Sequence, residues 1–296
     1  MKLATYRYHD EQHLGLVDRE NACIYPATAC VPGAPDELIA WVKRYGVDMP
    51  QVSYENVEAL PLAHVSLEAP IPKPERNIMC VGKNYLAHAN EFSRSGFDRS
   101  DNAKAAEAPE APIIFTKAPS SVIGPGGAVR YPAGLSEKLD YEAEVGVVIG
   151  RGGRGIRRSE AYSHVFGYVI INDVTARDLQ ALHRQWFIGK SMDTFCPMGP
   201  WVVTSDEIDP ENLSVRCWVN DELRQDANTR DLIFDIPTLV ETLSAGITLM
   251  PGDIIATGTP QGVGIGFDPP RFLKPGDRMR VAIDGLGELE NSVGSA

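Results

Sequence analysis

Two glutamates stand two residues apart in the stretch LDYEAEVGVVIG, residues 139–150. The second half of this stretch, Val145 to Ile149, is apolar and β-branched, which is typical of a buried strand. Residues two apart on a strand point to one face, so Glu142 and Glu144 would project side by side. Buried carboxylates this close repel each other unless a cation lies between them, and Mg²⁺ prefers such oxygens. The stretch therefore predicts half of a metal site, or else a solvated acidic edge strand.

A third carboxylate follows the next apolar segment. Val165 to Ile171 is predicted to be a second buried strand, and Asp173 comes directly after it. A helix is predicted over 175–186, and spacings of four and three place Asp173, Arg177 and Gln180 along one side of the chain. Asp173 would supply the third oxygen ligand, and its alternative role is that of a helix N-cap.

A histidine and a glutamate three residues apart form a second candidate constellation. On a helical turn His88 and Glu91 would share a face. A carboxylate next to an imidazole raises its basicity and orients it, as a general base acting on water requires. A surface pair of the same spacing is the alternative. The polar segment 93–111 that follows is predicted to be a loop, either a lid over a site or a plain surface loop.

One lysine lies in an otherwise apolar segment framed by glycine and proline. This segment, 189–200, is predicted to be irregular, and the ammonium of Lys190 could stabilise a developing oxyanion. An exposed loop lysine is the other interpretation.

The run Gly150 to Gly155 formally matches the GxGxxG pattern of dinucleotide sites. However, the following IRRSEAYSHV is too short and too polar for the crossover helix that such a site needs. We therefore predict a turn here, and a nicotinamide oxidoreductase remains only as an alternative that a cofactor titration would test.

The composition restricts the partners of this protein. The 296 residues carry a net charge of −12, which argues against binding to nucleic acid or to an anionic membrane. The five cysteines are odd in number and scattered, as expected for reduced thiols in a cytoplasmic protein. The sequence shows no secretory h-region and no run of membrane-spanning length.

The chain is predicted to divide at a proline-dense connector, residues 70–74. Before it, strands at 2–8 and 14–25 and an amphipathic helix at 35–45 predict a small α/β domain over 1–72. This N-terminal domain has no cluster of chemically useful side chains, so packing or dimer support is its expected role. Residues 73–296 would form the catalytic domain.

The motifs taken together resemble the fumarylacetoacetate hydrolase family, in its shorter bacterial form. The resemblance covers essentially all of residues 75–296 and implies an α+β, mainly β fold, with a mixed β-sandwich roll as the C-terminal domain. It also implies a homodimer and Mg²⁺ or Mn²⁺ as the cofactor. The segments that carry it, in family order, are CVGKNYLAHANE (80–91), FTKAPSS (115–121), DYEAEVGVVIG (140–150), INDVTARDLQ (171–180), GKSMDTFCPMGPWVV (189–203) and GDIIATGTPQGVG (252–264).

The resemblance also implies roles for individual residues. It implies that Glu142, Glu144 and Asp173 are the metal ligands and that His88 and Glu91 activate water. It further implies that Lys190 stabilises an oxyanion. Substrate contacts are implied for Arg177, Gln180 and Thr257. The longer family members have a fourth metal carboxylate, and this sequence has no acidic counterpart near Val81. The metal would therefore be held by three protein ligands.

The expected activity is hydrolysis of a carbon–carbon bond in a small anionic 2,4-dioxo acid, such as an acylpyruvate or fumarylpyruvate. The ion would polarise the keto group, the histidine would activate water, and the ion and Lys190 would stabilise the departing enolate. The same chemistry supports isomerisation of a 2-hydroxymuconate-type acid or decarboxylation of a 2-oxo acid. A catalytically silent, metal-binding family member is a further alternative.

Overall fold

The fold is mainly β, as the sequence predicts. The computed structural model describes residues 1–97 and 108–295, so most of the loop expected at 93–111, and its possible role as a lid, lie outside the described residues. Strands hold 35% of the residues and helices 22%, and the sheets are mixed. The α+β, mainly β class is therefore confirmed.

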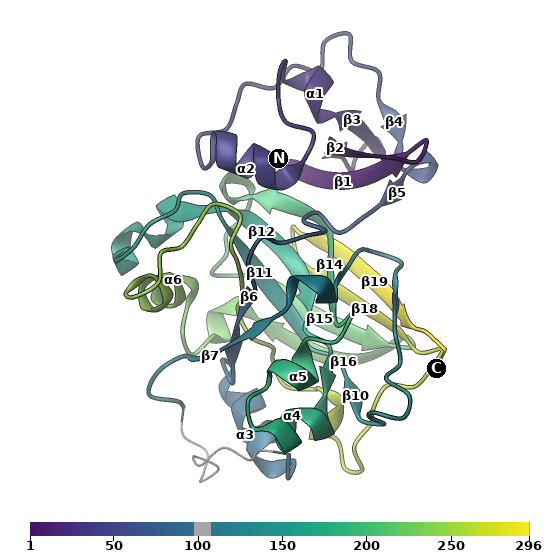
Figure 1. Ribbon diagram of the computed structural model, residues 1–296, viewed down its shortest axis with the longest axis vertical. Helices are drawn as coiled ribbons and strands as arrows, with labels where there is room; N and C mark the ends of the chain where they lie inside the picture. Colours follow the sequence, from purple (N-terminus) through teal and green to yellow (C-terminus); the bar gives the residue numbers. More distant parts are fainter. Residues whose placement is uncertain (98–107, 296) are drawn as a thin grey trace.

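The largest sheet places the acidic strand near its centre (Figure 1). In the described residues it has twelve strands, and β11 pairs antiparallel with β12 on one side and with β17 on the other. The strands run, in spatial order, β4 (Leu60–Pro61), β3 (Cys23–Pro26), β2 (Glu11–Asp18), β1 (Lys2–Tyr8), β14 (Cys196–Thr204), β12 (Val165–Asn172), β11 (Ala143–Ile149), β17 (Ile254–Ala256), β6 (Ile78–Gly82) and β7 (Ile113–Lys117), with β5 (Ser66–Leu67) on β1 and β8 (Val122–Ile123) on β14.

A second sheet packs against the first and closes the core between them. Its strands, in spatial order, are β16 (Glu222–Asn228), β15 (Ser214–Val219), β18 (Arg278–Ile283), β19 (Gly287–Val293) and β9 (Ala128–Val129). A short pair, β10 (Leu139–Asp140) and β13 (Thr175–Ala176), lies beside the acidic strand. Val145 and Val147 of β11 belong to the core that includes Cys217 and Val281, whereas Val148 belongs to the core that includes Trp41. Because both faces of β11 are buried, its sequence is continuously apolar after the glutamates.

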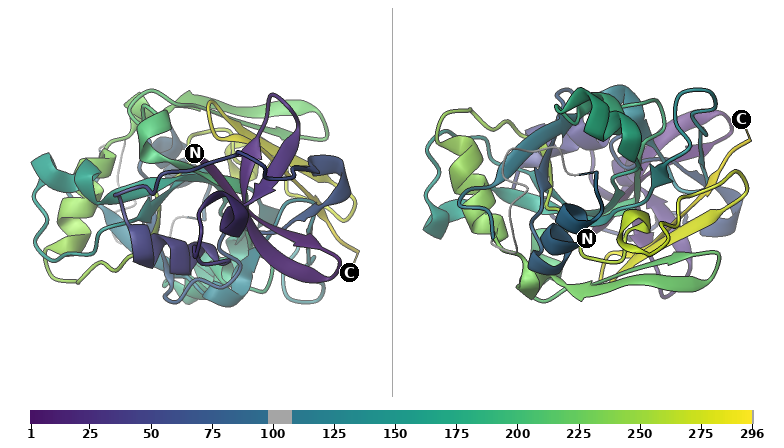
Figure 2. Two further views of the ribbon diagram at one scale, coloured as in Figure 1. Left: turned by 90° about the horizontal axis from the view of Figure 1, so that it is seen from above. Right: turned by 90° about the horizontal axis from the view of Figure 1, so that it is seen from below.

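The helices gather at the two ends of the molecule and along one side (Figure 1), and Figure 2 shows the two ends from above and below. One end carries α1 (Ala27–Cys30) and α2 (Leu38–Tyr45); the other carries α3 (Leu86–Arg94), α4 (Arg177–His183) and α5 (Phe187–Lys190). At the side lies α6 (Ile236–Ser244). The residue before it, Asp235, is its N-cap, because the Asp235 carboxylate accepts a hydrogen bond from Thr238 N. Over residues 1–97 and 108–295, the structure contains no helix with the length and apolarity needed to cross a membrane.

Several element boundaries differ from the prediction. The helix expected over 175–186 starts only at Arg177, because the two preceding residues form β13 with β10. The segment 189–200 is not irregular throughout, since α5 ends at Lys190 and β14 begins at Cys196. The Gly150–Gly155 run connects β11 to β12, and these strands are antiparallel neighbours, so the run does not open a parallel dinucleotide-binding unit.

The proposed division at residue 72 stays a prediction. The N-terminal strands form a compact group at one end of the molecule (Figure 1). Their sheet is nevertheless continuous with that of the remaining chain, because β1 pairs with β14 through Lys2 with Val203 and Leu3 with Val202. The five cysteines Cys23, Cys30, Cys80, Cys196 and Cys217 are unpaired and buried.

Candidate active site

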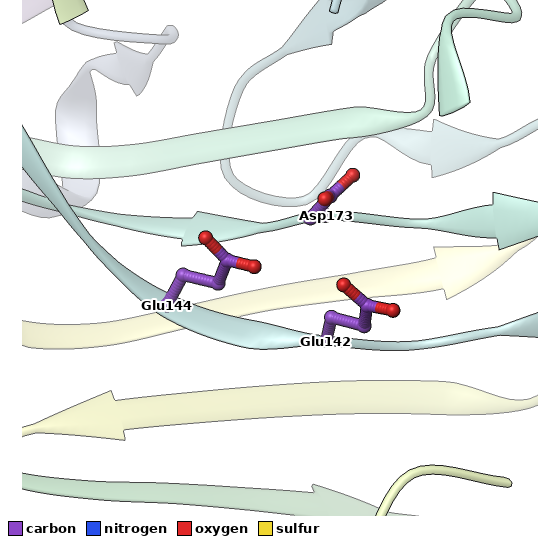
Figure 3. A group of neighbouring side chains, drawn as sticks. All are labelled: Glu142, Glu144 and Asp173. Carbon is purple, nitrogen blue, oxygen red and sulfur yellow. The ribbon is translucent and has the colours of Figure 1, made fainter. Parts of the chain in front are cut away.

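The three predicted metal carboxylates converge at one end of the β11–β12 pair (Figure 3). Ala143 pairs with Asn172, so Glu142 just before β11 lies opposite Asp173 just after β12, and Asp173 N donates to Glu142 O at 2.8 Å. Glu144 is two residues further along the same face. One carboxylate oxygen from each residue lies within 4.8 Å of the others, and all three side chains are buried. Antiparallel pairing therefore brings the sequence-predicted ligands together.

Cationic side chains surround two of the carboxylates. Lys190 Nζ donates to Glu142 Oε2 at 2.6 Å and to Asp173 Oδ2 at 2.8 Å. Arg177 Nη1 lies 2.6 Å from Glu142 Oε1, and Lys117 Nζ lies 2.6 Å from Asp173 Oδ1. Each oxygen of Glu142 and Asp173 thus has a cationic donor. Burial opposes ionisation of Glu142, but Lys190 and Arg177 outweigh it and lower its pKa to about 2.

Glu144 has a different electrostatic environment. Its Oε2 accepts a hydrogen bond from Gly258 N at 2.9 Å, and it forms no ion pair within the described chain. Burial, together with the neighbouring charges of Asp173 and Glu142, raises its pKa well above the usual range. A divalent cation next to Glu144 would relieve this repulsion. Three buried carboxylates that share one space fit a hard ion such as Mg²⁺ or Mn²⁺.

Arg177 links the acidic cluster to the adjacent pocket. It is the first residue of α4 and is only 1% exposed. Its Nε donates to Asp140 Oδ2 at 2.9 Å and its Nη1 donates to Gln180 Oε1 at 3.2 Å, one helical turn away. Among the described residues, its buried Nη2 has no hydrogen-bond partner. Because an unpaired buried N–H is costly, this atom is suited to bind an anionic oxygen of a ligand.

Asp173 is not a helix cap. The residue before α4 is Ala176, and no side chain caps this helix within the described chain. Both oxygens of Asp173 instead contact lysines of the cluster.

His88 and Glu91 form the expected pair on α3. Their contact joins His88 Nδ1 and Glu91 Oε2 at 3.2 Å, and His88 is 5% exposed. The other oxygen of Glu91 accepts from Gly262 N at 3.0 Å. The helix is fixed by a small core of its own, in which Phe92 packs with Val263 and Ile265. Glu91 is therefore held at both oxygens and orients the imidazole.

One pocket unites most of the predicted residues. It is a partly open space of about 290 Å³, a volume that includes solvent at its mouth. Its polar lining includes His88, Glu142, Arg177, Gln180 and Lys190, so the imidazole of the general-base pair and the cationic groups face one space. The pocket is further lined by Val81, Gly82, Lys83, Phe92, Phe115, Trp186 and Thr259.

The predicted substrate contact at Thr257 lies elsewhere. Its hydroxyl donates to Val145 O at 2.9 Å, and of the two loop threonines it is Thr259 that lines the pocket. Lys117, which was not predicted as a site residue, is fully buried at the end of β7. Its signal was present, because a lysine that closes an apolar strand in the segment FTKAPSS needs a buried anion as partner.

Comparison with known proteins identifies the family. Residues 77–294 match the family described as Fumarylacetoacetate (FAA) hydrolase C-terminal. The chain belongs to the fumarylacetoacetate hydrolase family. Oxaloacetate tautomerase YisK of Bacillus subtilis (strain 168) is 49% identical over 259 residues, covering 87% of this chain and 81% of that protein.

Solved structures of the fumarylacetoacetate hydrolase family share the whole fold. The fumarylacetoacetate hydrolase of psychrophilic Exiguobacterium antarcticum is 41% identical, with a TM-score of 0.86 and 100% coverage of both chains. The maleylpyruvate hydrolase of Sphingobium sp. SYK-6, in complex with manganese(II) ion and pyruvate, is 35% identical, with a TM-score of 0.77 and 99% coverage of both chains. The relatives thus include a tautomerase and hydrolases, and the family is one of enzymes.

Proposed function

We propose that this protein is a divalent-metal-dependent enzyme that interconverts the keto and enol forms of a small 2-oxo diacid of the oxaloacetate type. The observation that carries the proposal is the shared pocket, in which His88, oriented by Glu91, faces Arg177 and Lys190. The 49% identity to a protein named as an oxaloacetate tautomerase also ranks tautomerisation ahead of the hydrolysis expected from the sequence.

In this proposal His88 moves the proton. When Nδ1–H is donated to Glu91, Nε2 carries the free electron pair of the imidazole. Nε2 removes a proton from the carbon next to the keto group, and the C–H electron pair becomes the carbon–carbon double bond. The electron pair of the keto C=O moves onto oxygen, and the imidazolium then returns the proton to that oxygen. The product is the enol, and the histidine is regenerated.

The cations of the pocket bind the charged parts of the substrate. Arg177 Nη2 would donate to a substrate carboxylate, and the ammonium of Lys190 lies where it can stabilise negative charge on the keto oxygen. A divalent cation held by Glu142, Glu144 and Asp173 would withdraw electrons from the keto group and make the adjacent C–H more acidic. These groups explain how a protein with a net charge of −12 can bind a dianion.

The test is an absorbance assay on enolic oxaloacetate. The purified protein with Mn²⁺ or Mg²⁺ should accelerate the decay of the enol absorbance, and chelator should remove the acceleration. A rate equal to that of the buffer, with metal bound, would overturn the proposal. Parallel detection of pyruvate from oxaloacetate would reveal decarboxylation instead.

Hydrolysis of a 2,4-dioxo acid is the second candidate function. The His88–Glu91 pair has the arrangement needed to activate water, and a 35% identical neighbour is a maleylpyruvate hydrolase. Incubation with an acylpyruvate, followed by detection of pyruvate, distinguishes this function from tautomerisation.

We also propose that the protein acts as a homodimer in the cytoplasm. The homodimer is inferred from the family resemblance, and five unpaired cysteines favour a reducing compartment. Sedimentation analysis of the purified protein would test the dimer, and cell fractionation would test the compartment.

A further inference from the structure

Asp140 is a buried carboxylate whose two oxygens each accept two hydrogen bonds from the protein, which leaves no oxygen free to bind a metal ion. It is 0% exposed. Its Oδ1 accepts from Tyr141 N at 2.9 Å and from Gly264 N at 2.6 Å. Its Oδ2 accepts from Ile265 N at 3.1 Å and from Arg177 Nε at 2.9 Å. Four donors saturate the group, so it holds other parts of the chain in place.

The loop that Asp140 holds reaches the catalytic pair on α3. Gly262 N donates to Glu91 Oε1 at 3.0 Å, two residues before Gly264. The hydroxyl of Tyr141 fixes the same point of the loop, since it donates to Gly262 O at 2.8 Å. The loop 262–266 thus lies between two carboxylates, that of Asp140 from β10 and that of Glu91 from α3.

Two glycines make this close fit possible. A Cβ atom on Gly264 would lie 2.7 Å from Asp140 Oδ1 and 2.4 Å from Arg271 O. A Cβ atom on Gly266 would lie 1.6 Å from Glu91 Oε1. Any side chain at Gly266 would displace the Glu91 carboxylate, whereas hydrogen packs against it. The loop therefore transmits position by direct contact at both ends.

We propose that Asp140 is a positioning residue that sets both halves of the active site. By accepting a hydrogen bond from Arg177 Nε, Asp140 orients Arg177, the group proposed to bind the substrate carboxylate. Through the loop 262–266 it fixes Glu91, which orients the His88 imidazole. This inference rests on the proposed function for what each half does, but the mechanical link is a property of the chain alone.

The central variant is Asp140→Asn. An asparagine oxygen can still accept from Tyr141 N and Gly264 N, but its NH₂ group then faces the donors Ile265 N–H and Arg177 Nε–H. We expect KM for oxaloacetate to rise and kcat to fall, each about tenfold, because two hydrogen bonds to a charged group are lost. We also expect hydrogen exchange to become faster in the loop 262–266 and in α3 together.

The matched control is Asp253→Asn. Asp253 is likewise buried, accepts from Met250 N at 2.8 Å and pairs with Arg76 at 2.7 Å. Its backbone carbonyl bonds Ile149, at the end of β11 away from the glutamates. This variant should speed exchange near Met250 and leave KM, kcat and exchange in α3 unchanged. If Asp253→Asn speeds hydrogen exchange in α3 as much as Asp140→Asn does, the faster exchange reflects general destabilisation of the fold, and the proposal is overturned.

Double variants test whether the link is continuous. Gly266→Ala breaks the contact with Glu91 at the far end of the loop. Its effect on kcat should be much less than additive with that of Asp140→Asn, because both interrupt one path. Additive effects on kcat would overturn the proposal, as would unchanged exchange in α3 when Asp140 is replaced.

A milder variant covers the case in which Asp140→Asn does not fold. Tyr141→Phe removes only the hydroxyl that fixes Gly262 O, so it should lower kcat and speed exchange in α3 while leaving KM unchanged. Unchanged exchange in α3 in this variant would likewise overturn the proposal. The exchange experiment needs no substrate. If the protein proves inactive on oxaloacetate, the proposed function fails, and the link between Asp140 and α3 is still decided.

Discussion

The ammonium nitrogen of Lys190 lies 2.6 Å from Glu142 Oε2 in a fully buried setting. Arg177 contacts the other oxygen of this glutamate at the same distance of 2.6 Å. Burial works against the charge on Glu142, but the two cations outweigh burial and lower its pKa to about 2, so Glu142 is ionised at neutral pH. For Lys190 too, burial would lower the pKa, but Asp173 and Glu142 raise it. Glu142 and its partners Lys190 and Arg177 are therefore all charged, and these charges should affect both the pH dependence of stability and the binding of a metal ion.

Acid should destabilise the protein through Glu142. Its folded pKa of about 2 lies below the ordinary value of 4.5, so its contribution to stability is present above pH 4.5 and is lost as the pH falls toward 2. The lost free energy of unfolding should be about 3 kcal/mol. Denaturant titrations in chelator between pH 2 and 5 would measure it. Glu142→Gln should lack this part of the pH dependence, and an unchanged slope would contradict the assignment.

Metal binding should release a proton from Glu144. Its raised pKa means that the folded protein without metal holds a proton there above pH 4.5, and the ion must displace it. Affinity for Mn²⁺ should therefore increase with pH, and calorimetry in buffers of different ionisation enthalpy should show proton release. With chelator present, the contribution of Glu144 to stability should fall as the pH rises above 4.5. This pH dependence is opposite to that of the Glu142 contribution, which is lost as the pH falls. Glu144→Gln should bind Mn²⁺ weakly and release no proton; release equal to wild type would identify another donor.

Removal of the base should strongly reduce kcat without loss of metal affinity. His88→Ala should lower kcat by about 10²- to 10⁴-fold, the range of general acid–base catalysis, while Mn²⁺ affinity stays within about twofold. Glu91→Gln should cause a smaller loss because the imidazole remains but is less well oriented. His164→Ala is the control, since His164 contacts Arg151 O on the connection between β11 and β12. A His88→Ala variant that keeps normal kcat would require a different base.

Arg177→Lys should weaken substrate binding more than catalysis. Lysine has one nitrogen in place of three and cannot contact Asp140, Glu142 and the substrate together. KM should rise by about tenfold or more, with loss of a charge-assisted hydrogen bond as the cause. Arg158→Lys is the matched control, because Arg158 also makes a bidentate contact with an aspartate, Asp235, but on the surface. An unchanged KM in Arg177→Lys would place the substrate carboxylate elsewhere.

The acidic cluster could be predicted from the sequence because its residues lie at or next to strands that short-range patterns identify. The two-residue period of a strand places Glu142 and Glu144 on one face, and an apolar run before Asp173 predicts a neighbouring strand. The antiparallel register of the two strands then brings Asp173 opposite Glu142, although residues 150–164 separate the strands in the chain. His88 and Glu91 are likewise one helical turn apart.

Contacts between distant segments could not be predicted from such patterns. Lys117 contacts Asp173 across 56 positions of the chain, and nothing in the period of either strand specifies this partner. The late start of α4 has a similar cause, because the preceding residues pair with β10. In the loop after β17, Thr257 and Thr259 have the same side chain, and only the tertiary contacts assign one to Val145 and the other to the pocket.

The two halves of the active site are built on supports of very different strength. Glu144 lies in β11, and Glu142 and Asp173 directly adjoin β11 and β12, which are paired on both sides in the middle of a large sheet. His88 and Glu91 instead belong to a nine-residue helix with a small core of its own. Substitutions in the helix can therefore alter the His88–Glu91 pair while the strands next to the acidic cluster stay in place. The same acidic cluster can thus be combined with different groups on the helix, and the relatives of this chain include both a tautomerase and hydrolases.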